Sequence, residues 1–148
     1  MSKSLSLSRV IIPDSYFDVP TEIFDIYVED IDAVVGRIEY RHETGQDLIY
    51  YGNIGYLIYH AYRGHNYAYH ACVALLEMID AHIDVVYITC NPDNIASKKT
   101  IEKLKAVHLG MVDIDPKHEL YRYGEKQKEV YIITRDGEYE TIIETFNK

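Results

Sequence analysis

Three features that often mark a specialised class of protein are missing from this sequence of 148 residues. No apolar run approaches the roughly 20 residues that a membrane-spanning helix needs, so we expect no membrane segment. Residues 1–8 alternate polar and apolar side chains without the apolar block of a secretory signal, which predicts a cytoplasmic protein. Neither a repeat nor a low-complexity linker divides the chain, so we expect a single domain over residues 1–148.

Tryptophan is absent and cysteine is scarce. Cys72 and Cys90 lie far apart in the sequence without a C-x-x-C spacing, so we expect buried, reduced thiols. His60, His65 and His70 recur every five residues, which would suggest a metal site. On a helix, however, this spacing turns about 140° per step and the rings would not converge. The sequence therefore predicts no metal.

Basic residues are few and form no tract. The chain has 15 Lys and Arg against 24 Asp and Glu, a formal net charge of −9. We expect no nucleic-acid partner, because binding to phosphates needs clustered cations. A nicotinamide site is not expected either, because Gly52, Gly55 and Gly64 do not form G-x-G-x-x-G. An acidic surface favours cationic acceptors such as polyamines, aminoglycosides or lysine side chains, and it also serves solubility alone.

The first half of the sequence has the pattern of consecutive β-strands. Apolar alternation bounded by turn residues predicts strands over residues 5–12, 23–29, 33–42 and 48–59. Short turns between successive strands predict an antiparallel meander.

In the second half of the sequence the spacing of the apolar residues changes. Apolar residues spaced by three and four predict a helix over 67–83, and a β-branched run predicts a strand buried on both faces over 85–89. The remaining elements are a helix capped by Asp93 or Asn94 and ending near 107, and strands over 109–114 and 130–134. The strand, helix and strand between 54 and 89 predict a right-handed parallel crossover. We therefore expect an α/β fold in which an antiparallel meander runs into one parallel β-α-β pair.

The segment that follows the fourth predicted strand has the composition of an anion-binding turn. Tyr62-Arg63-Gly64-His65-Asn66-Tyr67-Ala68 leads from this strand into the first predicted helix. The N–H groups of such a loop and of a helix N-terminus carry partial positive charge and converge on one point. A pyrophosphate fits this arrangement, and Arg63 can add a charge-assisted contact.

This motif resembles the signature of the Gcn5-related N-acetyltransferase (GNAT) family: Arg or Gln, two residues, Gly, one residue, then Gly or Ala. The resemblance extends through Asn94-Ile95-Ala96-Ser97 and Glu102-Lys103-Leu104, and in element order it covers residues 33–134. It implies a GNAT-like mixed sheet with reduced N-terminal helices. It also implies an acetyl-CoA co-substrate, no metal, and acetyl transfer to an unidentified primary amine by direct attack in a ternary complex.

The same resemblance implies where the co-substrate would bind. The pyrophosphate of CoA would contact the backbone amides of residues 63–68, and the pantetheine arm would pair with the strand edge at residues 57–59 and with Asn94. The implied co-substrate residues are Leu57, Ile58, Tyr59, Arg63, Gly64, His65, Asn66, Tyr67, Ala68, Asn94, Ser97 and Lys103.

Three commonly functional positions depart from the family pattern, and Lys105 and Ala106 also replace its usual Gly-Phe. Asn66 replaces the most characteristic Gly, but Asn tolerates the left-handed conformation better than other non-Gly residues, so we expect the loop to form. Asn53 stands where many relatives have a Glu that helps to deprotonate the amine. Ile101 stands where many have a Tyr that protonates the leaving thiolate.

These departures leave more than one interpretation open. If the protein is an enzyme, Glu39 would deprotonate the amine through water, and Ser97 or Tyr121 would protonate the thiolate. Surface or capping roles also fit these three side chains. Alternatively, the same fold keeps an acyl-CoA pocket as a non-catalytic sensor or regulatory module, or the motif is an ordinary strand–helix turn of an unrelated α/β domain. By analogy with relatives, the tyrosine-rich segment 121–139 suggests a homodimer.

Overall fold

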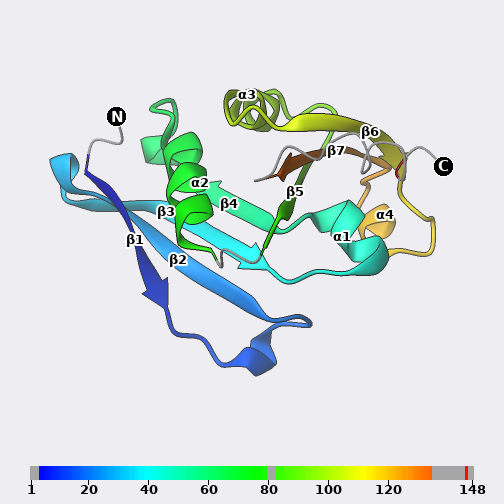
Figure 1. Cartoon of the computed structure of the whole chain (residues 1–148), viewed down its shortest axis with the longest axis horizontal. Helices are drawn as coiled ribbons and strands as arrows, with labels where there is room; N and C mark the ends of the chain where they lie inside the picture. Colours follow the sequence, from blue (N-terminus) through cyan, green and yellow to red (C-terminus); the bar gives the residue numbers. More distant parts are fainter. Residues whose placement is uncertain (1–3, 80–82, 135–145, 147–148) are drawn as a thin grey trace.

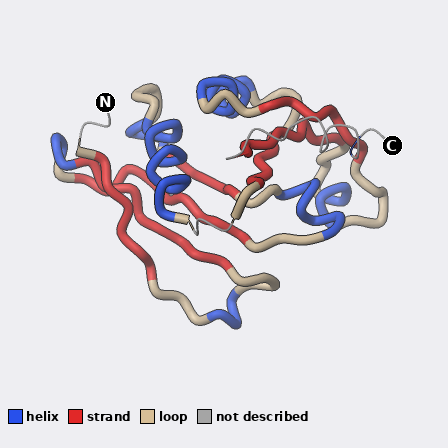
Figure 2. Tube along the Cα trace, in the orientation of Figure 1, coloured by secondary structure: helices blue, strands red, loops and turns tan. Residues whose placement is uncertain are grey.

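The computed structural model describes residues 4–79, 83–134 and 146, and the strands of these residues form two antiparallel sheets (Figures 1 and 2). In the first sheet the strand order is β1 (Leu5–Val10), β2 (Thr21–Val28), β3 (Ala33–Arg41) and β4 (Ile54–Ile58). In the second sheet the order is β5 (Val85–Cys90), β7 (Gln127–Thr134) and β6 (Val107–Asp113). The antiparallel meander predicted for the first half of the chain is confirmed.

Short helices connect these strands. The α-helices are α1 (Gly45–Tyr51), α2 (Tyr67–Met78), α3 (Ile95–Lys103) and α4 (Glu119–Arg122). The described residues also contain the 3-10 helices η1 (Asp14–Tyr16), η2 (Glu29–Ile31) and η3 (His60–Tyr62). Between β1 and β2, where every residue is described, the chain forms η1 and no α-helix. None of the described helices is both long enough and apolar enough to cross a membrane.

The first sheet has one apolar face because side chains alternate along its strands. In β2, Phe24, Ile26 and Val28 are buried, and the residues between them are more exposed. Helix α2 packs against β1, β3 and β4 and buries Cys72 and Leu75 in the same core. A buried aliphatic side chain of this size contributes about 1.5–3 kcal/mol relative to an exposed one. The apolar stripe of α2 and this face of the sheet therefore hold each other in place.

The second sheet has apolar clusters on both faces. Val86 of β5 and Ile101 of α3 lie in the core that α2 shares with the first sheet. On the other face, Leu109 and Ile132 form a separate cluster, against which Ile49 of α1 packs. β5 is buried on the face that carries Val86 and half-buried on the face that carries Val85 and Tyr87, so the prediction of burial on both faces holds only in part.

One predicted strand, 48–59, is wrong over its first half. Residues 48–51 belong to α1, and β4 begins only at Ile54. The helix is held by tertiary packing, because Tyr50 is buried against Ile114 and Leu120. A short apolar run has no period that separates a buried helix from a strand. The short helix α4, which supplies Leu120, was not predicted.

The predicted parallel β-α-β pair is also not observed, because every strand pairing among the described residues is antiparallel. β4 and β5 approach each other at Asn53, whose backbone N–H donates to the Tyr87 carbonyl at 2.7 Å. The Tyr87 N–H then bonds to the side-chain Oδ1 of Asn53 at 2.8 Å instead of to a backbone carbonyl. A side chain therefore takes the place of the next ladder bond, and the two strands separate beyond this point.

Candidate functional site

A cleft of ≈ 640 Å³ lies between the open edge of β4, the loop before α2, and α3. This volume is within the range of small-molecule sites, roughly 300–1,000 Å³. The lining residues are Tyr56, Leu57, Ile58, Tyr62, Arg63, Gly64, Asn66, Tyr67, Ala68, Asn94, Ala96, Ser97, Lys99, Thr100 and Lys103.

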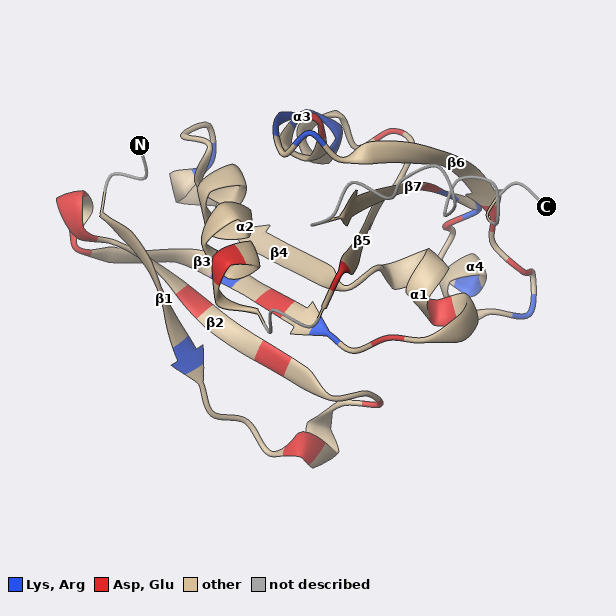
Figure 3. Ribbon diagram, viewed as in Figure 1, with Lys and Arg blue, Asp and Glu red and all other residues tan. Residues whose placement is uncertain are grey.

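The cleft is cationic although the protein is acidic. Arg63, Lys99 and Lys103 line it, and none of the lining residues named above is Asp or Glu. Figure 3 shows the basic residues of α3 in blue, beside a chain whose strands and loops carry many acidic residues in red. With a net charge of −9 over the chain, this local excess of positive charge favours an anionic ligand.

The loop at one end of the cleft has the left-handed backbone that an anion-binding turn requires. Gly64 has φ +90°, and Asn66 has φ 61° and ψ 22° at the start of α2. The expectation that Asn66 adopts the left-handed conformation is confirmed. The first N–H groups of a helix have no intrahelical acceptor and carry partial positive charge. Because Tyr67 and Ala68 line the cleft, this positive end faces the same space as the three cations.

The edge of β4 offers backbone hydrogen-bonding groups to the cleft. The N–H of Tyr59 donates to the Val35 carbonyl of β3 at 2.8 Å. Alternate residues of a strand direct their N–H and C=O groups to opposite edges, so those of Tyr56 and Ile58 point to the open edge. In agreement, the Ile58 carbonyl accepts a hydrogen bond from Arg63 Nε at 3.0 Å. An extended ligand with amide groups can therefore pair with β4 as an additional strand.

Two hydroxyl groups meet inside the cleft. The phenol of Tyr56 donates to Ser97 Oγ at 3.1 Å, which joins β4 to the first turn of α3. Burial raises the pKa of the Tyr56 phenol, and the hydrogen bond to Ser97 opposes this shift only in part, so the phenol is protonated at neutral pH. Tyr56 was not predicted as a site residue. Its place between Ile54 and Ile58 in the strand alternation was the signal that it points to the same face.

The cleft brings together most of the predicted co-substrate residues: Leu57, Ile58, Arg63, Gly64, Asn66, Tyr67, Ala68, Asn94, Ser97 and Lys103. It does not include Tyr59 or His65. The His65 ring lies 5.3 Å from that of Tyr67, centroid to centroid. Asn94 caps α3 as predicted, because its Oδ1 accepts the Ser97 N–H at 3.1 Å. Its amide NH₂ group is therefore the part that can donate to a ligand.

Two of the three predicted catalytic side chains lie outside the cleft. Glu39 is opposite Gly55 on the sheet face away from α2 and forms an ion pair with Arg41 at 3.4 Å. Tyr121 lies in α4, where Lys126 Nζ is 3.4 Å from the centroid of its ring. Ser97 alone of the three lines the cleft.

Neither cysteine is suited to nucleophilic chemistry. Cys72 and Cys90 are free and buried, as predicted. Burial raises the pKa of the Cys72 thiol to about 12 and also raises that of Cys90, so both are protonated at neutral pH. Among residues 4–79, 83–134 and 146, no group of three or more His, Cys, Asp or Glu side chains could hold a metal ion.

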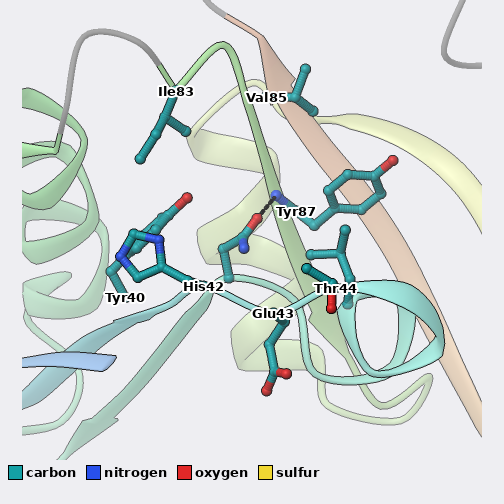
Figure 4. A pocket seen from close by; sticks show the side chains of 9 residues that line it. Tyr40, His42, Glu43, Thr44, Ile83, Val85 and Tyr87 are labelled. Atoms are coloured by element: carbon teal, nitrogen blue, oxygen red, sulfur yellow. Dashed lines mark hydrogen bonds between the residues drawn. The ribbon is translucent and has the colours of Figure 1, made fainter. Parts of the chain in front are cut away.

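A second pocket, of ≈ 300 Å³, lies where the end of β3 approaches the start of β5 (Figure 4). Tyr40 and His42 lie on one side of it and Val85 and Tyr87 on the other. Asn53, which joins the two sheets, also lines this pocket. The pocket therefore lies where β4 and β5 meet at Asn53, whereas the cationic cleft is lined by residues of β4 beyond this point.

Comparison with known proteins identifies the family. Residues 16–107 match the model of the acetyltransferase (GNAT) domain. The chain belongs to the GNAT family. No curated protein matches it in sequence. The resemblance drawn from Arg63 to Ala68 and from Asn94 to Ser97 is therefore confirmed at the level of the family.

Solved structures of acetyltransferases share the fold of this GNAT chain. The microcin C7 self-immunity acetyltransferase MccE, in complex with acetyl-CoA and AMP, has a TM-score of 0.62 and 17% identity, over 77% of this chain and 61% of that one. A GNAT-family acetyltransferase from Bacillus anthracis has a TM-score of 0.59 and 23% identity, over 77% and 66%. The ribosomal-protein-S5-alanine acetyltransferase from Vibrio fischeri has a TM-score of 0.61 and 20% identity, over 79% and 63%. The chain thus spans less than two thirds of the length of MccE and of the Vibrio fischeri enzyme.

Proposed function

We propose that this GNAT protein is an acetyl-CoA-dependent N-acetyltransferase that transfers an acetyl group to a primary amine by direct attack in a ternary complex. The observation that carries the proposal is the cationic cleft along the open edge of β4. Two relatives by fold support the choice of co-substrate: the MccE structure contains acetyl-CoA, and a structure of the ribosomal L7/L12 acetyltransferase RimL contains CoA.

The chemistry of CoA matches the groups that the cleft provides. Its phosphates would bind to the N-terminus of α2 and to Arg63, Lys99 and Lys103, which supply the only formal charges among the lining residues. Its pantetheine arm is an extended chain with two amide groups, which would pair with the edge N–H and C=O groups of β4. The thioester would then lie near Tyr56 and Ser97, at the opposite end of the cleft from the phosphate loop.

Acetyl transfer forms a C–N bond and breaks the C–S bond of the thioester. The amine must first lose a proton, because a free lysine amine has a pKa of about 10.4. We assign this step to Glu39 acting through water, since its side chain lies beside Gly55 on β4. An edge N–H of β4 would stabilise the oxyanion. Ser97 would pass its proton to the departing thiolate and recover one from the Tyr56 phenol, which already donates to it at 3.1 Å. The phenol would regain a proton, through water, from the nitrogen of the tetrahedral intermediate as the C–S bond breaks.

Calorimetry with acetyl-CoA, followed by an assay for free thiol with a panel of amines, tests this proposal. We expect micromolar binding, about −8 kcal/mol, and thiol release with at least one amine. Glu39→Gln should flatten the alkaline side of the pH–rate profile. Lys103→Ala should weaken binding, whereas Lys117→Ala, an exposed lysine that does not line the cleft, should not. Binding without thiol release for any amine would favour the non-catalytic sensor, and no binding at all would refute both.

A further inference from the structure

One buried polar side chain takes no part in the chemistry proposed above. Asn53 is the one polar or charged residue that is buried among the described residues, and 6% of its surface is exposed. A buried polar group is stable only when its hydrogen bonds are satisfied, so the hydrogen-bond partners of Asn53 indicate its role.

Asn53 bonds to strands on both sides through its backbone and its side chain. Toward β5, its N–H donates to the Tyr87 carbonyl at 2.7 Å, and its Oδ1 accepts the Tyr87 N–H at 2.8 Å, the dashed line that ends at Tyr87 in Figure 4. Toward β3, its carbonyl accepts the Arg41 N–H at 2.6 Å, and its Nδ2 donates to the Arg41 carbonyl at 2.8 Å. One residue therefore joins the two sheets with four hydrogen bonds.

The four hydrogen bonds of Asn53 form a junction between the two sheets. The residue before Asn53 allows the backbone to approach β5 closely at this junction. Gly52 has φ +68°, which other residues rarely adopt. A Cβ atom at this position would lie 2.9 Å from the Tyr87 carbonyl oxygen and 3.2 Å from the Cα of Ile88. Glycine thus lets the backbone of the junction contact β5 directly, and Asn53 bonds to the strand at the same point.

This junction is the vertex at which β4 and β5 meet, and the proposed co-substrate cleft begins beyond it. Beyond it, β4 pairs with β3 alone among the described strands, and its other edge lines the cleft. Tyr56 follows Asn53 by three residues, so about 10 Å of strand separates the vertex from the thioester end of the cleft. A change of angle at the vertex would therefore move the N–H groups of β4 relative to Ser97.

We propose that Asn53 is a positioning residue that sets the separation of β4 from β5 and so places the edge of β4 against the thioester of the co-substrate. This inference rests on the proposed acetyl-CoA site. The amide is the side chain that the junction requires, because it presents one acceptor to the Tyr87 N–H and one donor to the Arg41 carbonyl. A carboxylate at residue 53 would keep the acceptor but place a negative charge near the Arg41 carbonyl. The position at which many relatives have an acidic group thus serves here to join strands.

Two ligands that use different ends of the cleft test the proposal. Acetyl-CoA needs both the phosphate loop and the edge of β4, whereas adenosine 3′,5′-bisphosphate needs only the nucleotide end. We expect Asn53→Ala to weaken acetyl-CoA about tenfold and to leave the bisphosphate affinity within about twofold. Asn53→Asp keeps the acceptor for Tyr87 and should give an intermediate loss. Faster amide exchange at the Tyr87 N–H in both variants should accompany the loss.

Val28→Ala is the matched control, because Val28 is 2% exposed in β2 and does not line the cleft. It should lower stability without changing the ratio of the two affinities. The inference is overturned if the Asn53 variants weaken both ligands equally, or if they leave acetyl-CoA binding unchanged. If Asn53→Ala does not fold, the ratio measured for Asn53→Asp decides. Failure of the wild-type protein to bind acetyl-CoA would instead overturn the proposed function itself.

Discussion

The left-handed conformation of Asn66 leads to a prediction about both stability and ligand binding. Asn66 replaces the glycine of the family motif and has φ 61° and ψ 22°. Its side chain makes no capping hydrogen bond to the described residues at the start of α2, so substitutions there change mainly the backbone preference. We consider Asn66→Gly, which removes the steric cost of this conformation, and Asn66→Val, which increases it.

The expected magnitudes follow from the cost of this backbone conformation. The left-handed conformation costs an L-residue about 1–2 kcal/mol, and a β-branched residue bears the whole of this cost. Asn66→Val should therefore lower the free energy of unfolding by about 1–2 kcal/mol. Asn66→Gly should stay within about 0.5 kcal/mol of the wild type, because the relief of strain is offset by greater freedom of the unfolded chain. If the valine loop must regain the left-handed turn to bind phosphate, the Kd for acetyl-CoA rises about 5- to 30-fold.

Urea denaturation and calorimetry with acetyl-CoA measure these two quantities. Lys105 offers a control, because it also has a positive φ, 59°, but does not line the cleft. Lys105→Val should cost a similar amount of stability and leave the affinity for acetyl-CoA unchanged. The reasoning is refuted if Asn66→Val is as stable as the wild type, or if Asn66→Gly and Asn66→Val weaken acetyl-CoA binding equally.

Three further predictions concern charge, packing and pH. Lys103→Ala should weaken acetyl-CoA binding about tenfold at low salt and less at 0.5 M salt, as measured by calorimetry, because ions screen the phosphate contact. Ile101→Ala should lower the free energy of unfolding in urea by about 2–5 kcal/mol, since Ile101 is fully buried. Burial raises the pKa of Glu129, but hydrogen bonds from His108 and Lys98 lower it more, to below its usual 4.5. The stabilising effect of the Glu129 carboxylate is therefore present above the unfolded-state pKa and is lost as the pH falls through the lower folded-state pKa. Glu129→Gln should have a lower free energy of unfolding than the wild type at pH 7, and should lose less of it on acidification.

Each of these expectations has a contrary result. An equal loss of affinity for Lys103→Ala at both salt concentrations would argue against a phosphate contact. A loss below about 1 kcal/mol for Ile101→Ala would mean that the core around α3 collapses into the space left by the side chain. Parallel pH–stability curves for Glu129→Gln and the wild type would show that this carboxylate gains nothing from its partners.

Local interactions explain which parts of the site the sequence predicts. The left-handed turn at Asn66 and the cap of α3 by Asn94 involve residues within four positions of each other, so their side-chain types carry the information. The GNAT motif from Arg63 to Ala68 is of the same kind. The strand alternation of the first sheet and the apolar stripe of α2 also follow from a fixed period in the sequence. These features determined the family and predicted where the phosphates of the proposed co-substrate would bind.

The remaining features depend on contacts between distant segments. Residues 48–51 form a helix because Tyr50 packs against residues more than sixty positions away, not because the run has a helical period. The bond between Tyr56 and Ser97 spans 41 positions, and that between Asn53 and Tyr87 spans 34. Such pairs exist only after β4, β5 and α3 have packed together. By itself, the sequence determined that this is a GNAT chain, through the motif from Arg63 to Ala68. Tertiary structure alone decided that β4 and β5 meet at a side chain and then separate, because the chain must fold before either strand reaches its neighbour.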